Sequence, residues 1–417
     1  MRTARVWRRL LGVEHTVIEA VELAEQDAGE EVLVARIRPT RSRRSRCSRC
    51  ERRCRGYDQG DGRRRWRTLD VGTVKAYLEA DAPRVACPEH GVVVAAVPWA
   101  RPGARCTRAF EDTAAWLAAH AAGSVVATLL RVTWRTVTGI VTRVVADLAG
   151  RTDRLDGLRR LGIDEIAHRK GHRYLTVVID HDTGRIVWAD TGRDGATLHR
   201  FFDALGPQRA ALLTHVSADG AEWIHTVVAD RAPQAVRCLD PFHVVAWATK
   251  ALDQVRRETW NELRRTGRPE QAKSLKGSRW ALVKNPEDLT GEQRTTLAGI
   301  AATNKALYRA YLLKEQLRAV FQAKETGGRA LLAGWLAWAR RSRLPAFVKL
   351  AQTIERYRSL IWNTLEHELS NARSEATNVH LRVLTRRAYG YHSPEALIAM
   401  AMLTRGGLCP DLPGRAA

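Results

Sequence analysis

The feature that most constrains the fold is the order of strands and helices between residues 158 and 243. Runs rich in β-branched residues indicate strands, and turn residues such as those from His181 to Gly184 separate them. The expected strands cover 161–165, 174–179, 185–189, 211–217 and 235–239, and the expected helices cover 196–205 and 221–229. The resulting order, β-β-β-α-β-α-β, is a more specific signal than any single residue within it.

Acidic residues stand at the ends of strands in this region. Asp164 lies on the first strand, Asp219 follows the fourth, and Asp240 follows the fifth. This arrangement is that of an RNase H-like domain, in which the metal-binding Asp after the fourth strand lies next to the first strand. The alternative is that Asp164 and Asp219 only complete turns, as most acids at strand ends do.

Carboxylates in this pattern suit one kind of chemistry. Phosphodiester transfer requires two divalent cations about 4 Å apart, held by acids from distant parts of the chain. Mg²⁺ prefers oxygen ligands and keeps several waters, so two or three acids suffice. We therefore expect Asp164, Asp219 and an acid from a C-terminal helix to hold Mg²⁺ or Mn²⁺.

The C-terminal part of the chain is expected to be helical. Residues 244–390 contain no competing strand pattern, and breaks are expected at 284–286, 326–328 and 344–345. One helix near the end is predicted to carry an apolar stripe in steps of four and three, formed by Leu365, Leu369, Ala372, Ala376, Val379 and Val383. A polar stripe runs beside it, formed by Asn371, Glu375, Asn378, Arg382 and Arg386. Glu375 is therefore the candidate for the third acid.

The cysteines predict a second metal site. Seven cysteines in a cytosolic chain of this size argue against a disulfide framework. Cys47 and Cys50 form one knuckle, Cys87 and His90 form another, and two such knuckles can hold one tetrahedral Zn²⁺. Cys54 could replace one of these ligands. The alternative to a metal site is a set of scattered buried thiols.

Three helical patterns occupy residues 107–149. A helix is expected over 107–122, a short helix over 125–130 capped by Ser124, and a third helix from Thr133 onward. This layout is typical of a helix-turn-helix, whose second helix enters the major groove by its N-terminal residues. Three short helices could equally form a plain core. The candidate DNA contacts are Thr133, Trp134, Arg135, Thr136 and Arg143.

The charge favours nucleic acid as the partner. There are 68 Lys and Arg residues against 45 Asp and Glu, a net charge of +23, and each basic side chain that neutralises a phosphate releases a counterion. Genomic G+C bias also enriches arginine and is the alternative explanation.

A length of 417 residues predicts several modules. We expect a β hairpin, with strands near 15–23 and 31–37, and a zinc-binding module within 1–100. A helix-turn-helix domain is expected over 105–150, and a catalytic domain over 158–400 with a helical insertion at about 247–365.

At these residues the sequence resembles the ISL-three family of insertion-sequence transposases, which carry a DDE catalytic domain. The resemblance covers nearly the whole chain in the family's order. Its matching segments are Gly162–Val178, Val216–Gly220, Asp240–Val245 and Asn371–Asn378. Trp223 stands where tyrosine is expected, and Cys54 is additional to the first knuckle; neither departure touches the acids.

The resemblance implies a fold, a set of site residues and a reaction. The fold class is α/β multidomain: an RNase H-like catalytic domain with a mixed five-stranded sheet and a large all-helical insertion, preceded by a helix-turn-helix and a small β zinc-ribbon-like module. Asp164, Asp219 and Glu375 would form the DDE triad. Asp240 and His243 would support it as a D-x-x-H pair, and Asn371 and Asn378 are further supporting candidates.

The implied reaction cuts the element end with a metal-activated water, and the 3′-OH produced then attacks target DNA. The implied partners are double-stranded DNA, both terminal inverted repeats and target, and at least one further copy of the chain, because two ends must be brought together. The cofactors are catalytic Mg²⁺ or Mn²⁺ and structural Zn²⁺.

Two other classes of protein stay open. A DNA-binding regulator derived from a transposase would bind repeats without cutting, and loss of an acid would reveal it; all three acids are present. An RNase H-like nuclease or resolvase would share the acids and lack only strand transfer. No apolar run approaches the roughly 20 residues of a membrane span, and the N-terminal residues lack a secretory signal. We therefore expect a cytoplasmic protein.

Overall fold

The computed structural model describes residues 2–26, 29–169, 171, 173–323, 325–367, 369, 372–388 and 390–415. The chain divides into two compact units, and each is described by itself. The first comprises Met1–Arg154 with Leu381–Ala417, and the second comprises Leu155–His380. Across the described ranges, none of the helices is both long enough and apolar enough to cross a membrane.

The first unit begins with a helix and two small sheets. Its elements are α1 (Arg2–Leu10), β1 (Thr16–Gln26), β2 (Glu30–Pro39), β3 (Arg55–Asp58), β4 (Arg63–Val71), β5 (Val74–Asp81), β6 (Arg84–Cys87) and β7 (Gly91–Val94). One sheet has the order β1-β2-β5-β4 and the other has the order β3-β6-β7. The predicted hairpin is confirmed as the antiparallel pair β1 and β2. Trp66 and Trp99 pack edge to face in the core of the larger sheet, with ring centroids 5.6 Å apart.

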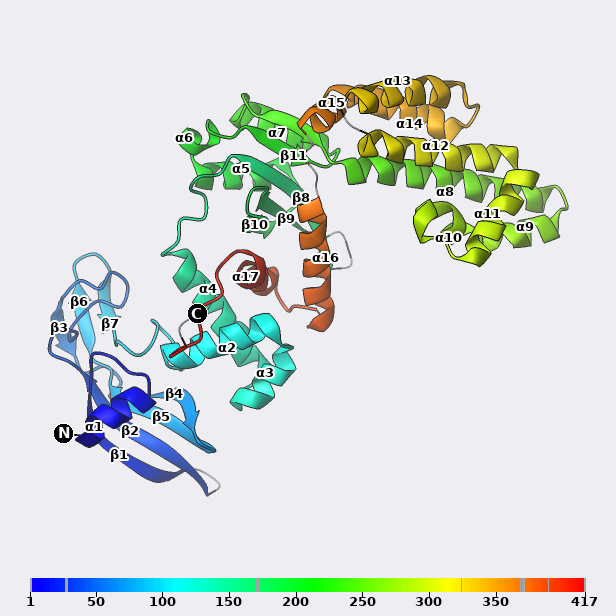
Figure 1. The fold of residues 1–417 in the computed structure, drawn as a ribbon. Coiled ribbons are helices and arrows are strands. Elements are labelled where there is room, and N and C mark those ends of the chain that lie inside the picture. The colour runs from blue at the N-terminus through cyan, green and yellow to red at the C-terminus, as the bar shows by residue number, and fades with distance from the viewer. Residues whose placement is uncertain are drawn as a thin grey trace. The chain divides into compact units, whose positions relative to one another are not determined.

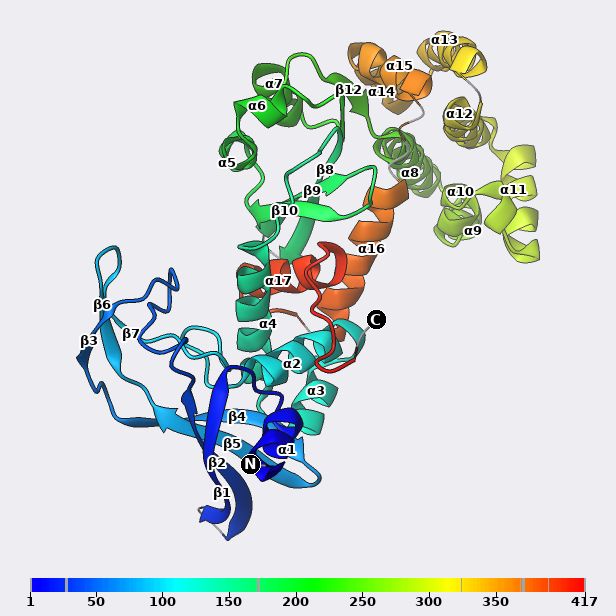
Figure 2. The same cartoon turned by 60° about the vertical axis from the view of Figure 1, so that its left-hand side comes forward.

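Helices complete the first unit. They are α2 (Arg108–His120), α3 (Gly123–Leu130), α4 (Trp134–Ala149) and α17 (Pro394–Arg405), and Figure 2 shows α17 beside α4, against which it packs. The third helix begins where it was expected, at α4, and Thr133 is its N-cap, because its Oγ1 accepts a hydrogen bond from the amide of Thr136. The expected Ser124 cap is wrong: α3 begins at Gly123, so Ser124 already lies inside the helix and Ala122 occupies the N-cap position.

The second unit is built on a five-stranded sheet with the order β10-β9-β8-β11-β12. Its strands are β8 (Arg160–Arg169), β9 (Arg173–Asp180), β10 (Ile186–Thr191), β11 (His215–Ala218) and β12 (Val236–Leu239), and the connecting helices are α5 (Gly195–Leu205), α6 (Pro207–Ala210) and α7 (Glu222–Arg231). β9 is antiparallel to β8 and β10, whereas β8, β11 and β12 are parallel. The fourth strand begins at His215 and not at residue 211, because the apolar residues after α6 continue its turn.

The core of this sheet lies between β8 and the helices α5 and α7 (Figure 1). Leu161 and Ile163 point to that side and pack with Phe201 of α5 and Ile224 of α7. Side chains alternate across a strand, so Asp164 points to the opposite face from Ile163. Asp164 of β8 therefore lies outside the apolar core between the sheet and the helices α5 and α7.

A helical insertion joins β12 to the last helices of the chain. It consists of α8 (Pro241–Arg265), α9 (Pro269–Lys276), α10 (Arg279–Val283), η1 (Pro286–Asp288), α11 (Gly291–Thr303), α12 (Lys305–Gln322), α13 (Glu325–Arg341), α14 (Pro345–Arg356) and α15 (Arg358–His367). These helices share their own core around the fully buried Trp335. Figures 1 and 2 show them as a bundle that extends away from the sheet.

Two of the three expected breaks in this region are confirmed, at 284–286 and at 344–345. The break expected at 326–328 lies a few residues earlier: α12 ends at Gln322 and α13 begins at Glu325, so Gly327 and Gly328 lie inside α13. A Cβ on Gly328 would lie 2.9 Å from the carbonyl oxygen of Val320 and 3.0 Å from Leu365 Cδ2. Close packing, and not a change of direction, therefore requires this glycine.

The apolar stripe expected from Leu365 to Val383 is also wrong as a feature of one helix. α15 ends at His367, and α16 (Ala372–Arg387) begins a new helix, so the helical phase is not carried across the gap. Val379 and Val383 are exposed, whereas Leu381 and Leu384 are buried.

Candidate active site and DNA-binding elements

The register of the sheet brings three aspartates to one level. Ala218 of β11 pairs with Ile163 of β8 and with Leu239 of β12. The residues that follow these three are Asp164, Asp219 and Asp240. Three adjacent parallel strands therefore present an aspartate at the same level: Asp164 within β8, Asp219 just after β11, the middle strand, and Asp240 just after β12.

Asp164 is buried, with 5% of its surface exposed. Its Oδ1 accepts a hydrogen bond from the amide of Glu165 at 2.7 Å, and its Oδ2 accepts one from Asn378 Nδ2 at 2.5 Å. Burial raises the pKa of Asp164, although the hydrogen bond from Asn378 opposes the shift. Asn378, one of the expected supporting residues, thus lies directly against the first acid.

Asp219 lies in the turn between β11 and α7. Its Oδ1 accepts a hydrogen bond from the amide of Ala221 at 2.9 Å. Its backbone carbonyl oxygen lies 2.8 Å from His225 Nε2. The turn is therefore fixed at both its side chain and its backbone.

Asp240 is held more fully than Asp219. It caps α8, where its Oδ1 accepts from the amide of Phe242 at 2.9 Å, and its Oδ2 lies 2.7 Å from His243 Nδ1. Burial lowers the pKa of His243, but the hydrogen bond to Asp240 and the charges of Asp219 and Asp164 outweigh it, and the net shift is upward. Both oxygens of Asp240 thus have protein partners, and the neighbouring aspartates favour the protonated form of His243.

Glu165 is an acid that the sequence did not single out. Its side chain is only 4% exposed; one carboxylate oxygen pairs with Arg193, and Oε1 is buried with no hydrogen-bond partner among the described residues. Burial, followed by the charge of Asp219, raises its pKa to about 7. The strand expected to end at this Asp-Glu pair in fact continues to Arg169, and nothing local in the sequence indicated that the second acid would be buried.

The other two expected site residues are described only in part. Residue 375 lies in α16, three positions before Asn378, and its side chain is outside the described part of the structure. Asn371 lies outside the described residues.

The two knuckles come together around one point. The ligand atoms of Cys47, Cys50, Cys87 and His90 all lie within 4.8 Å of one another. Cys50 Sγ is 3.7 Å from Cys87 Sγ, and Cys47 Sγ is 3.8 Å from His90 Nδ1. Gly91 has a φ of +67°, a left-handed conformation that favours glycine directly after the second knuckle. Three thiols and one imidazole at these spacings fit a tetrahedral Zn²⁺.

Cys54 is not a member of this group of four. Its Sγ lies 3.3 Å from the carbonyl oxygen of Arg52.

Burial would raise the pKa of the Cys87 thiol, but hydrogen bonds from the backbone amides of Glu89 and His90 outweigh it and lower that pKa to about 7. A lowered pKa favours the thiolate, which is the form that binds metal.

The N-terminus of α4 exposes the residues expected to contact DNA. Trp134 is 47% exposed and stacks on His392, with ring centroids 4.8 Å apart. The guanidinium of Arg135 lies 5.8 Å from the Trp134 ring centroid. Thr133 and Thr136 form the cap, with their hydroxyl oxygens 2.9 Å apart.

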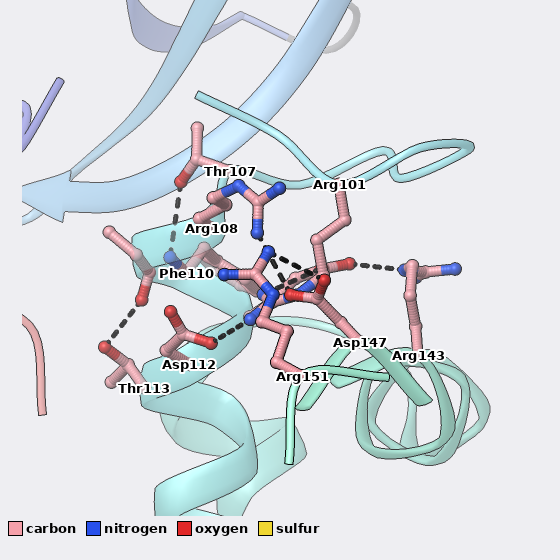
Figure 3. Close-up of polar contacts among 11 residues, drawn as sticks. Arg101, Thr107, Arg108, Phe110, Asp112, Thr113, Arg143, Asp147 and Arg151 are labelled. Atoms are coloured by element: carbon pink, nitrogen blue, oxygen red, sulfur yellow. Dashed lines mark hydrogen bonds and ion pairs between the residues drawn. The ribbon is translucent and has the colours of Figure 1, made fainter. Parts of the chain in front are cut away.

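In the C-terminal half of α4, arginines and acids form a network with α2 and Arg101 (Figure 3). Arg101, only 4% exposed, donates to Asp112 at 2.6 Å and to Asp147 at 2.8 Å, and its third nitrogen lies 3.3 Å from Glu111. Arg143 Nε donates to Glu111 Oε1 at 2.7 Å. The network joins α2 to α4, and Arg143 belongs to it, apart from the exposed end of the helix.

Comparisons with known proteins agree along the whole chain. Residues 161–401 match a transposase family of the DDE type within ISL3, residues 95–145 match the helix-turn-helix domain of transposase family ISL3, and residues 43–90 match the zinc-finger of transposases IS204, IS1001, IS1096 and IS1165. The transposase for insertion sequence element IS1557 of Mycobacterium tuberculosis, in strains CDC 1551 and H37Rv, is 54% identical over all of this chain and 98% of its own length. The chain belongs to the ISL3 transposase family.

A more distant relative matches part of this ISL3 transposase. The transposase for insertion sequence element IS1001 of Bordetella parapertussis is 32% identical over 56% of the chain and 58% of its own length. The predicted function is confirmed: the protein is a DNA transposase of an insertion sequence, and its enzyme class is the DDE transposases. The zinc-finger match falls on the segment that holds the four clustered ligands.

Proposed function

We propose that Asp164, Asp219 and Glu375 hold the catalytic Mg²⁺ or Mn²⁺ of this transposase within an RNase H-like domain. The observation that carries the proposal is the register that sets Asp164 and Asp219 level on adjacent parallel strands. Glu375 is supported by its place in α16, because positions three apart share a helix face and Asn378 contacts Asp164.

The chemistry of the side chains fits this cation. Carboxylates are the oxygen ligands that Mg²⁺ prefers, and Asp219 has only one side-chain oxygen engaged by a described hydrogen bond. When bound, a pair of such cations supplies an activated water or 3′-OH and stabilises the leaving oxygen. The chain itself holds the carboxylates at one end of the sheet and supplies the orienting hydrogen bonds.

The remaining polar residues have supporting roles in this proposal. Asn378 orients the carboxylate of Asp164 by a direct hydrogen bond. Asp240 holds His243, whose positive charge partly balances the acids and can position a DNA phosphate. Asn371, which lies outside the described residues, is proposed as a further supporting residue.

The N-terminal half is proposed to bind DNA. Zn²⁺ on Cys47, Cys50, Cys87 and His90 would hold the small β module, which we place within residues 1–100 as a zinc ribbon. The helix-turn-helix at 105–150 would read the terminal inverted repeats through Thr133, Trp134, Arg135 and Thr136. Arg143 would reach DNA only by giving up its ion pair with Glu111.

The catalytic domain is proposed to span 158–400, with the helical insertion at about 247–365. Two element ends must be joined to one target, so we propose at least a dimer acting on the inverted repeats and the target DNA. The protein is expected to act in the cytoplasm, where such DNA is reached.

The experiment is incubation of the purified protein with Mg²⁺ and DNA that carries the element's flanking inverted repeats, followed by mapping of nicks and of joined products. Nicks at the element ends together with joined strands support the proposal. Nicks without joining would indicate a nuclease or resolvase, and binding without nicks would indicate a regulator.

A further inference from the structure

Side chains of the helical insertion contact the turn that carries Asp219. Tyr357, between α14 and α15, donates a hydrogen bond from its hydroxyl to the carbonyl oxygen of Gly220 at 2.9 Å. Trp247 of α8 lies directly against Gly220: a Cβ added there would lie 2.3 Å from Cζ2 and 2.7 Å from Cη2 of the indole. The rings of Trp247 and Tyr357 pack on each other with centroids 5.7 Å apart.

The same turn is held from the sheet's own side. His225 of α7 has its Nε2 2.8 Å from the carbonyl oxygen of Asp219, which is a hydrogen-bond distance. Because a carbonyl oxygen can only accept, the ring nitrogen is the donor. The carbonyls of Asp219 and Gly220 are thus bound by side chains from two different parts of the second unit. Such contacts fix the direction in which the Asp219 side chain leaves the strand.

The insertion also binds the neighbouring edge strand. Asn363 Nδ2 donates to the carbonyl oxygen of Arg237 at 2.8 Å, and Thr364 Oγ1 donates to that of Leu239 at 2.7 Å. Both donors belong to α15, and both acceptors belong to β12, the last strand of the sheet. Leu239 directly precedes Asp240, so the insertion contacts the ends of β11 and β12, the strands that Asp219 and Asp240 follow.

We infer that the helical insertion is a positioning element for the metal-binding carboxylates, and that Trp247 and Tyr357 are its positioning residues at Asp219. The inference rests on the proposed function, because it takes Asp219 as a metal ligand. Functional side chains must be held within about 0.5 Å of their productive geometry. A misplacement of about 1 Å can cost about 100-fold in rate.

Gly220→Ala is the sharpest variant for testing this inference. Gly220 is not among the residues with a left-handed φ, so alanine adds no backbone strain and its effect comes from the contact with Trp247. We expect the added methyl group to shift the turn, to weaken Mn²⁺ binding by about 10-fold or more and to slow Mg²⁺-dependent nicking by about 100-fold. Adding Trp247→Leu to this variant should restore only part of both, because it relieves the clash but also removes a ring that positions the turn.

The measurement is Mn²⁺ affinity by electron paramagnetic resonance on the full-length protein, with nicking and end binding measured beside it. Mn²⁺ affinity reports the carboxylate geometry without requiring turnover. Trp338→Leu is the matched control, because Trp338 packs against the insertion core and has no described contact with the turn. It should keep wild-type Mn²⁺ affinity.

Tyr357→Phe provides a second variant should Gly220→Ala fail to fold. It removes the hydrogen bond to Gly220 and keeps the ring, and Tyr308→Phe is its control within the same helical core. Weaker Mn²⁺ binding in Tyr357→Phe but not in Tyr308→Phe supports the inference.

Unchanged Mn²⁺ affinity in both Gly220→Ala and Tyr357→Phe, beside loss of Mn²⁺ in Asp219→Asn, would overturn the inference and leave the proposed function standing. Wild-type Mn²⁺ binding by Asp219→Asn would overturn both.

Discussion

Each of the two units holds a group of buried and half-buried carboxylates, and the two clusters are built in opposite ways. In the first unit, Glu111, Asp112 and Asp147 each face Arg101, and Glu111 also faces Arg143. In the second unit, Asp164, Asp219 and Asp240 receive hydrogen bonds from backbone amides, Asn378 and His243. Within the described part of the chain, no lysine or arginine forms an ion pair with these three aspartates.

The difference separates structural acids from acids available to a cation. A buried carboxylate needs compensation, and the arginines of the first unit provide it permanently. At the sheet, compensation is partial: burial raises the pKa of Asp164, and Glu165 retains a buried oxygen without a hydrogen-bond partner among the described residues. A divalent cation would complete the second cluster, whereas the first is already complete.

The largest expected effect falls on the second cluster. Glu375→Gln should abolish cleavage and joining and spare binding to the repeat ends, because it keeps side-chain volume and helix propensity but removes the charge that holds a cation. Nicking and gel-shift assays on one repeat-end substrate measure the two activities. Glu395→Gln is the matched control, since Glu395 is an exposed acid in the first turn of another helix, α17. Undiminished nicking by Glu375→Gln would mean that another acid, with Glu366 or Glu368 the nearest candidates, is the third ligand.

Removal of Zn²⁺ should unfold part of the first unit and leave the five-stranded sheet of the second unit folded. A structural Zn²⁺ contributes about 10 kcal/mol or more to the folding of small zinc modules. A strong chelator should therefore unfold residues 40–95, and hydrogen exchange should show protection lost there but retained in β8 and β9. Cys50→Ser should lose the zinc and Cys54→Ser should keep it. Metal analysis that finds no zinc in protein purified without chelators would contradict this prediction.

Breaking the first cluster should cost stability. Arg101→Met leaves three acids facing an apolar side chain, and loss of one partner from a buried ion pair costs about 3–5 kcal/mol. Thermal unfolding should show the loss of stability, and hydrogen exchange should locate it in α2 and α4. Arg105→Met is the control, because Arg105 is exposed. Equal stability of the two variants would show that the network is not structural.

A smaller effect is expected at Asp240, which has protein partners for both oxygens and follows the strand that is not adjacent to that of Asp164. Asp240→Asn should slow Mg²⁺-dependent cleavage by about 10 to 100-fold, the usual scale for a residue that orients a metal ligand or its neighbours. Because Asp240 also caps α8, thermal unfolding should be measured beside cleavage to separate the two roles. If the activity of Asp240→Asn in Mg²⁺ is as low as that of the wild-type protein without Mg²⁺, Asp240 belongs to the metal site.

Local patterns predicted much of this molecule. The spacing of Cys47, Cys50, Cys87 and His90 was enough to find the cluster, because each knuckle is a short turn. The strands around Asp164 and Asp219 followed from runs of β-branched residues bounded by turns.

The sequence-based predictions were wrong or incomplete where the structure depends on contacts between residues far apart in the chain. Gly328 looked like a helix break but accommodates Leu365, and the burial of Glu165 depends on how the loop carrying Arg193 returns to the sheet. Arg101 looked like one more basic residue in a DNA-binding protein. Its role depends on acids of α2 and α4, Glu111 and Asp147, which lie 10 and 46 residues further along the chain.

The most direct test of the account compares Asp219→Asn with Asp240→Asn on one intact and one pre-nicked repeat-end substrate in Mg²⁺. Both aspartates end strands of the same sheet, but only Asp219 lies next to the strand of Asp164. The account predicts that Asp219→Asn eliminates cleavage on the intact substrate and joining on the pre-nicked one, while Asp240→Asn retains measurable activity on both. An active Asp219→Asn protein beside an inactive Asp240→Asn protein would contradict it and assign the second metal ligand to Asp240.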